Sequence, residues 1–165
     1  MNADGQTAPP APSGSFLQRG GLWVLGQAAL MLAVFVLALV FPGGRRQTAA
    51  MVCGVLLLVA GGLCGIAAAV VLGGSLTPLP KPSGNTKLVR HGIYGLMRHP
   101  LYTSVILASV GWALIWQSGP ALWPALALGL FFDAKARREE RWLRERFPEY
   151  ADYARRVRRF IPWVY

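Results

Sequence analysis

Two clusters of polar residues border the last apolar segments of this 165-residue chain. The first is Arg98-His99-Pro100-Leu101-Tyr102, which leads directly into an apolar run, and the second is Glu139-Glu140. The chain has no Asp or Glu between Asp4 and Asp133, so this pair follows a long stretch without carboxylates. Carboxylate, imidazole and guanidinium groups can bind a charged ligand and orient a reacting group. Because polar groups at a bilayer boundary are costly unless satisfied, we expect the two clusters to form a functional site.

The elements that position these clusters are apolar enough to lie in a membrane. Hydrophobic residues make up 54% of the chain and charged residues only 15%. Two uninterrupted apolar stretches, Leu22–Phe41 and Ala49–Leu72, are each long enough to cross a hydrocarbon core of about 30 Å. The composition therefore predicts an all-α, polytopic integral membrane protein.

A third apolar segment runs from Leu101 to Trp116 and ends at a turn, Gln117 to Pro120. A fourth apolar segment ends near Phe132, but its helical pattern continues through charged residues to Arg146. We therefore expect about four transmembrane helices, the last two forming a short C-terminal hairpin. The fourth would protrude from the membrane as a charged helix, and an amphipathic tail helix would follow Pro148 and either lie at the head groups or dock onto the core.

The domain organisation is simple. Residues 1–20 are rich in Ala, Pro, Ser and Gly and read as a disordered tail, because such a composition cannot bury a core. They lack the basic start of a signal peptide. Residues 21–165 form a single predicted domain. Gly61-x-x-x-Gly65 predicts close helix packing, within the chain in preference to a dimer, and no spacing of His, Cys and acids predicts a metal site.

The charge distribution predicts the orientation of the protein. The formal charge is +10, yet ten of the seventeen basic residues follow Asp133 and are interleaved with acids. This pattern is typical of juxtamembrane segments and argues against nucleic acid as a partner. With four spans, fifteen basic residues share one side, which we expect to face the cytoplasm of a bacterial inner membrane. The residues flanking the first span alone, Arg19 and Arg45-Arg46, point weakly the other way.

A hairpin between the third and fourth segments would bring Arg98 and His99 close to the stretch from Asp133 to Glu140. On these residues the chain resembles a known family, the isoprenylcysteine carboxyl methyltransferase and phospholipid methyltransferase group of integral membrane enzymes. The resemblance covers about residues 76–162. Its ordered motifs are Leu76-Thr77-Pro78 with Pro80, Leu88-Val89-Arg90-His91-Gly92-Ile93-Tyr94, Arg98-His99-Pro100-Leu101-Tyr102, Glu139-Glu140-Arg141-Trp142-Leu143, then Phe147, Tyr150, Tyr153, Val157 and Arg159-Phe160-Ile161-Pro162.

This resemblance implies S-adenosylmethionine as the methyl donor, with Glu139 at its methionine end. The implied cofactor-binding residues are Lys87, Leu88, Val89, Tyr94, His99, Pro100, Tyr102, Glu139 and Glu140. Arg98 and Lys135 are the predicted catalytic residues, because either cation could orient a carboxylate acceptor.

Two positions depart from the family pattern. Ser104 stands where the family usually has Gly, and it either narrows the pocket or bonds back to its own helix. Lys135 stands where relatives acting on prenyl-cysteine place an Arg, and Lys lacks the bidentate fork that suits a carboxylate.

The leading hypothesis is a membrane methyltransferase that acts on a lipophilic acceptor from the bilayer, a carboxylate, thiol or amine. A carboxylate or thiol is favoured, because an amine must lose a proton and His99 is the sole candidate base. Two alternatives remain open, a reductase related to the membrane sterol reductases and a non-catalytic membrane partner protein. The acceptor's identity and the oligomeric state are left open by the sequence.

Overall fold

The computed structural model describes residues 20–44, 47–75 and 88–165. Within these ranges the regular structure is helical, and β pairing is confined to an isolated parallel bridge between Met97 and Arg158. The all-α prediction is therefore confirmed. The predicted disordered tail, apart from Gly20, and the predicted site residue Lys87 lie outside the described residues. The helices are α1 (Gly21–Val40), α2 (Thr48–Leu72), the 3₁₀ helices η1 (Gly73–Ser75) and η2 (Gly92–Gly95), α3 (Pro100–Ile115), α4 (Gly119–Arg146) and α5 (Tyr150–Arg156).

Two of these helices, α1 and α2, are long and apolar enough to cross a membrane. Their bounds match the predicted spans to within one residue at each end. Helix α3 is apolar but has only 16 residues, and the apolar part of the 28-residue α4 is similarly short. The total of four spans therefore stays a prediction.

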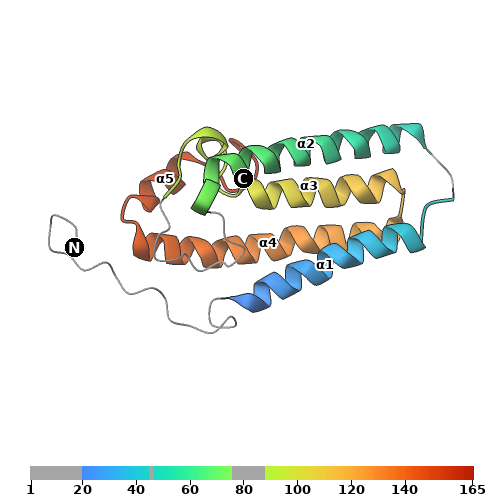
Figure 1. The fold of residues 1–165 in the computed structure, drawn as a ribbon, viewed down its shortest axis with the longest axis horizontal. Coiled ribbons are helices and arrows are strands. Elements are labelled where there is room, and N and C mark those ends of the chain that lie inside the picture. The colour runs from blue at the N-terminus through green and yellow to red at the C-terminus, as the bar shows by residue number, and fades with distance from the viewer. Residues whose placement is uncertain (1–19, 45–46, 76–87) are drawn as a thin grey trace.

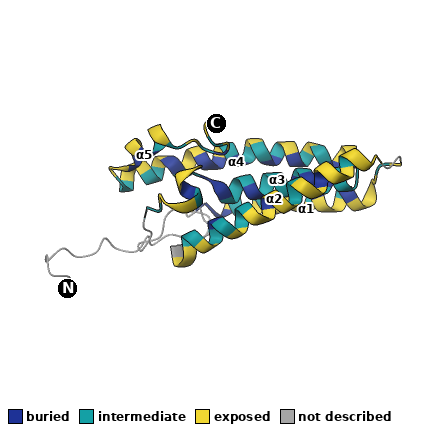
Figure 2. Ribbon diagram, turned by 90° about the horizontal axis from the view of Figure 1, so that it is seen from above, coloured by how far each residue is buried: buried dark blue, intermediate teal, exposed yellow. Residues whose placement is uncertain are grey.

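The four long helices lie side by side in an elongated bundle, in which α2 packs along α3 and α1 packs along α4 (Figure 1). The outer surfaces of α1 and α2 are largely exposed (Figure 2). The exposed side chains there are apolar, for example Leu56, Leu63 and Val70, of which Val70 is 75% exposed. A helix that exposes such side chains all along its length suits a lipid environment better than water.

Glycines allow α2 and α3 to approach closely. A Cβ atom on Gly111 would lie 2.6 Å from the carbonyl oxygen of Gly54, and one on Gly61 would lie 2.7 Å from that of Ser104. Gly65 likewise faces the side chain of Ser104. The Gly61-x-x-x-Gly65 motif thus packs within the chain, as expected from small residues at a membrane helix interface.

The hairpin between α3 and α4 turns at the predicted residues. Ser118 is the N-cap of α4, and its hydroxyl oxygen accepts a hydrogen bond from the backbone of Ala121 at 3.4 Å. The side chain of Gln117 exchanges hydrogen bonds with the backbone of Gln47, at 2.8 and 2.9 Å. These hydrogen bonds hold the turn, and with it the end of α3 and the start of α4, against the start of α2.

At the other end of the bundle, α4 continues as a charged helix to Arg146, and the chain then returns through α5. Tyr150 and Tyr153 of α5 are buried, and the Tyr153 hydroxyl donates to the carbonyl oxygen of Tyr94 at 2.6 Å. The tail helix thus docks onto the core, one of the two arrangements considered for it.

The glycine contacts predict a measurable difference in stability. Gly111→Ala should lower the free energy of unfolding in detergent by about 1–3 kcal/mol, because its methyl group would meet backbone atoms that cannot move aside. Gly62→Ala is the matched control, since a Cβ there has no neighbour within 4 Å. It should be neutral or stabilising by up to about 1 kcal/mol. Equal stabilities of the two variants in denaturant titrations would contradict this packing.

Candidate functional site

The first polar cluster is held against the C-terminal segment by backbone hydrogen bonds. The amide of Arg98 donates to the carbonyl oxygen of Arg158 at 2.8 Å, and the amide of His99 donates to that of Arg159 at 3.0 Å. Pro100 then occupies the first turn of α3, where its missing N–H costs no helix bond. The Thr103 hydroxyl also lies 3.1 Å from the carbonyl oxygen of Phe160. The motif therefore has a fixed backbone before any side chain is considered.

The carboxylate of Glu140 lies at the centre of the site. Its Oε1 atom accepts hydrogen bonds from Arg98 Nε at 3.0 Å, His99 Nε2 at 3.1 Å and Arg159 Nε at 3.0 Å. Its Oε2 atom accepts from Arg159 Nη2 at 3.1 Å. The Glu140 side chain is only 3% exposed, so this carboxylate is a buried acceptor shared by three elements.

This environment keeps Glu140 ionised. Burial alone opposes the charged form, but the hydrogen bonds from His99 and Arg159 and the positive charge of Arg98 outweigh it. The pKa of Glu140 is therefore held well below its ordinary range.

Glu139 occupies a different environment on the same turn of α4. Its carboxylate is 26% exposed and accepts a hydrogen bond from the Tyr102 hydroxyl at 2.7 Å. The ring of Tyr102 stacks between those of His99 and Phe132, at centroid distances of 5.2 and 4.6 Å. Glu139 is thus the accessible carboxylate of the pair, and it lies beside an aromatic surface.

Lys135 lies one turn before Glu139 and is 1% exposed. Its ammonium donates to the amide oxygen of Gln27 in α1 at 2.5 Å and lies 5.1 Å from the centroid of the Tyr102 ring. Of the two predicted catalytic cations, Lys135 is therefore buried, and the side chain of Arg98 is 9% exposed. Arg98 donates further hydrogen bonds to the carbonyl oxygens of Ala154 and Val157.

The other predicted site residues lie around this core. Tyr94 is buried in η2, and burial together with the charge of Glu139 raises the pKa of its hydroxyl to about 12. Leu88 and Val89 are half-buried at the start of the described segment. The Ser104 hydroxyl bonds back to its own helix, donating to the carbonyl oxygen of Leu101 at 2.8 Å. The structure thus brings Arg98, His99, Tyr102 and Lys135 together with Glu139 and Glu140, and the charge of Glu139 reaches Tyr94. The roles of all the predicted site residues stay predictions.

Three contributors to the site were not among the predicted site residues, although two of them, Tyr150 and Arg159, belong to the motifs of the resemblance. Arg159 bridges Glu140 and Asp133, with its Nη1 atom 2.7 Å from the Asp133 carboxylate. Gln27 contacts Lys135 from a helix predicted only to span the membrane. Tyr150 is buried, and its hydroxyl has no hydrogen-bond partner among the described residues. The charge of Glu140 reaches this hydroxyl and, after burial, raises its pKa. Among the described residues, no group of His, Cys, Asp and Glu could hold a metal ion.

Because the carboxylate of Glu140 is buried among cations, we expect its neutralisation to have a large effect on stability. Glu140→Gln should lower the free energy of unfolding by about 3–5 kcal/mol, because it removes the carboxylate partner of the Arg98 guanidinium and leaves Arg159 paired only with Asp133. The exposed ion pair of Asp152 with Arg155 provides the control, and Asp152→Asn should have no measurable effect. Denaturant titrations in detergent at neutral pH give both values.

The same carboxylate predicts a pH dependence. The pKa of Glu140 is lower in the folded protein than its ordinary value of 4.5, so its stabilisation is present above that pH and declines as the pH falls below it. We expect the stability difference between wild type and Glu140→Gln to shrink in that acidic range. A difference that stays constant from pH 7 to pH 3 would contradict the assignment.

Comparison with known proteins shows which family has a similar sequence. The family model described as phospholipid methyltransferase matches residues 49–150. The cobalt-zinc-cadmium resistance protein CzcN of Cupriavidus metallidurans is 35% identical over 96% of this chain and 74% of its own length. A probable protein-S-isoprenylcysteine O-methyltransferase of Oryza sativa is 31% identical over 86% of this chain and 76% of its own length.

A solved structure shares the fold. It is the eukaryotic intramembrane Ras methyltransferase, isoprenylcysteine carboxyl methyltransferase, which matches with a TM-score of 0.67 and 23% identity. The match covers 88% of this chain, and this chain spans 53% of that protein's length. The family match over more than half of the sequence and the two relatives together confirm the predicted resemblance: the chain belongs to the phospholipid methyltransferase family of membrane methyltransferases.

Proposed function

We propose that this protein is an integral membrane enzyme that transfers a methyl group from S-adenosylmethionine to a lipophilic acceptor drawn from the bilayer. The observation that carries the proposal is the contact of the His99–Tyr102 motif with Glu139 and Glu140 at the end of the apolar bundle. The contact lies in a member of a methyltransferase family, which makes methyl transfer the expected chemistry.

The residues around Glu139 fit the donor. A partly exposed carboxylate beside stacked aromatic rings suits an ammonium or sulfonium group. The unpartnered hydroxyl of Tyr150 adds a polar group that a ligand could satisfy, so we add it to the predicted cofactor residues. Glu140, with its four hydrogen bonds, is better suited to hold the site in shape than to touch the ligand. The same holds for Arg98, which we propose acts by positioning Glu140 and the C-terminal segment.

When bound, S-adenosylmethionine supplies a methyl group that is already activated on a sulfonium. The protein has mainly to align the acceptor with it, and such positioning contributes about 7–11 kcal/mol in favourable cases. An anionic acceptor such as a carboxylate or thiolate requires no base at that moment. An acidic acceptor is therefore favoured over an amine. The ammonium of Lys135, which lies over the Tyr102 ring, agrees with this preference.

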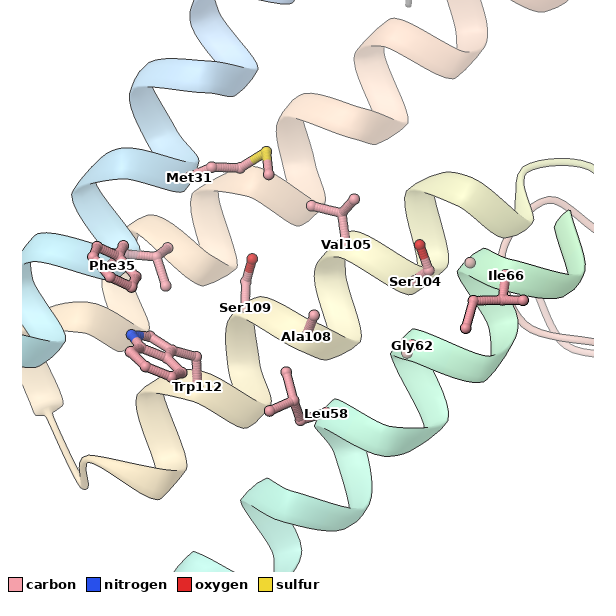
Figure 3. Close-up of a pocket in the computed structure, with 13 residues that line it drawn as sticks. Met31, Phe35, Leu58, Gly62, Ile66, Ser104, Val105, Ala108, Ser109 and Trp112 are labelled. Atoms are coloured by element: carbon pink, nitrogen blue, oxygen red, sulfur yellow. The ribbon is translucent and has the colours of Figure 1, made fainter. Parts of the chain in front are cut away.

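An apolar groove supports entry of the acceptor from the membrane. It has a volume of about 520 Å³ and lies between α1 and α2 with α3 as its floor (Figure 3). Met31 and Phe35 line it from α1, Gly62 from α2, and Ser104 and Trp112 from α3. Its lining is almost wholly apolar, which suits a hydrocarbon chain, and Ser104 lies one turn from Pro100 of the candidate site.

Two alternative functions remain to be tested against this proposal. A reductase of the sterol-reductase type would bind NADPH, and a non-catalytic partner protein would bind neither cofactor. The names of plant relatives refer to isoprenylcysteine, and a prenylated acid is therefore one acceptor to try first. Labelled methyl donor supplied to membranes, followed by separation of lipids and proteins, would identify the acceptor.

The role of Glu139 gives the direct test of the donor site. Glu139→Gln should weaken binding of S-adenosylhomocysteine by about 10- to 100-fold, since it removes one charge-assisted contact. Glu145→Gln, an exposed position on the same helix, should bind like wild type. Calorimetry on detergent-purified protein measures all three. Unaltered binding by Glu139→Gln would remove that residue from the site, and heat with NADPH in place of S-adenosylhomocysteine would favour the reductase.

The groove gives a separate test of the acceptor path. Gly62→Leu should reduce methylation of membrane lipids or prenylated proteins at least several-fold, because its side chain would fill part of the groove. Binding of S-adenosylhomocysteine should be unchanged. Gly129→Leu on α4 is the matched control, since Gly129 also has open space at its Cβ and does not line the groove. Equal loss of activity in both variants would show that the groove is not the path.

A further inference from the structure

Helix α1 carries one amide side chain, Gln27, and no ionisable residue between Gly21 and Val40. A lone amide in an apolar membrane helix is costly unless it is hydrogen-bonded. Its partner here is the ammonium of Lys135, at 2.5 Å. The helix that sequence reasoning assigned only to the membrane therefore contributes a hydrogen-bond acceptor to the polar cluster.

Because Lys135 is buried, its contact with Gln27 affects how easily the ammonium keeps its charge. The lysine is 1% exposed, and its ammonium also lies 5.1 and 5.9 Å from the ring centroids of Tyr102 and Phe132. An aromatic face attracts a cation, but a carbonyl oxygen at hydrogen-bond distance favours the charged form more strongly. Gln27 supplies such an oxygen from outside the helix that carries the lysine.

We propose that Gln27 is a positioning residue: it holds Lys135 as a fixed cation at the membrane boundary, and this cation selects acceptors that carry an acid group. The second half of the statement rests on the proposed methyl transfer, whereas the first half does not. A charge fixed in advance at a dry site is the arrangement that most favours an anionic reactant.

The surroundings of Lys135 have opposing effects on the pKa of its ammonium. Burial lowers the pKa of its ammonium, and the charge of Glu139, one turn further along α4, raises it. From α3 the facing group is Tyr102, whose hydroxyl donates to Glu139, and from α1 it is the neutral Gln27. Lys135 follows the apolar part of α4, which ends at Phe132.

The charges of the cluster support an acidic acceptor. Setting aside the exposed Arg137, which pairs with Asp133 at the surface, the three carboxylates of Asp133, Glu139 and Glu140 lie with three less exposed cations, Arg98, Lys135 and Arg159. Addition of S-adenosylmethionine, which carries one net positive charge, leaves an excess of one. An acceptor with one negative charge restores the balance in a site where unbalanced charge is costly. If Lys135 were neutral, this reason for preferring an acid would disappear.

The chain offers a direct measurement of the first half. It contains three lysines, Lys81, Lys87 and Lys135, so protein labelled with ¹³C at the lysine ε-carbons gives three signals. The variant Lys135→Arg assigns one of them by its disappearance. In a pH titration, Gln27→Met should lower the pKa of Lys135 by roughly 1 to 2, and Gln27→Glu should raise it. Lys81 and Lys87 should titrate as in wild type.

Gln47→Met is the matched control, because it removes a glutamine at the opposite end of the bundle, where Gln47 bonds to Gln117. It should leave the pKa of Lys135 unchanged. A Lys135 signal that titrates identically in wild type, Gln27→Met and Gln27→Glu would overturn the positioning role. Opposite shifts in the two variants support it, since a loss of folding would not produce them.

The second half is tested by methyl transfer from labelled S-adenosylmethionine into the lipids and proteins of isolated membranes. The alkaline limit of activity should move to lower pH in Gln27→Met and to higher pH in Gln27→Glu, by the amounts measured by NMR. A limit that stays fixed while the pKa moves would overturn the link between Lys135 and the acceptor. Absence of methyl transfer in wild type would instead refute the proposed function and leave the NMR result standing.

Discussion

The structure depends on one buried carboxylate. Glu140 of α4 accepts hydrogen bonds from Arg98 and His99, which precede α3, and from Arg159, which follows α5. Because a buried carboxylate is costly without its partners, these contacts favour the arrangement in which the three segments are packed together. The Glu140 carboxylate thus joins the α3–α4 hairpin to the polar C-terminal segment. It lies next in sequence to Glu139, the residue that we propose binds the methyl donor.

This arrangement separates the shape of the site from its chemistry. Glu140 and Arg98 are satisfied by the protein itself, whereas Glu139 keeps part of its surface open beside Tyr102. The two adjacent glutamates have different environments because an α-helix turns by about 100° per residue, so their side chains contact different neighbours. A rigid shell around an accessible group is the usual form of a site that must align its reactants closely.

Much of this could be predicted from the sequence. The spans followed from unbroken apolar runs, the hairpin from Gln117 to Pro120, and the meeting of Arg98 with Glu140 from the hairpin. Arg159 and Gln27 could not be assigned. Arg159 belongs to a motif of the resemblance, but it is one of several arginines in a basic tail, and the local pattern gives it no role and no partner. Gln27 is a single amide in an apolar run, and its partner lies 108 residues away, so only the packing of α1 on α4 identifies it.

The apolar groove and the polar cluster occupy different levels of the same bundle, and in the methyl transfer that we propose their meeting point limits where the reaction can occur. The groove follows α3 from Trp112 to Ser104, and the cluster begins at His99 and Pro100. The reacting atoms must therefore come together near the first turn of α3. Ser104 lies one turn after Pro100 and lines the groove, and its hydroxyl donates to the carbonyl oxygen of Leu101. The groove therefore has a side chain at the position where the family usually has Gly. On the proposed function, an acceptor held in the groove would pass Ser104 to reach the polar cluster, so the side chain at this position would act on the shape of the acceptor as Lys135 acts on its charge.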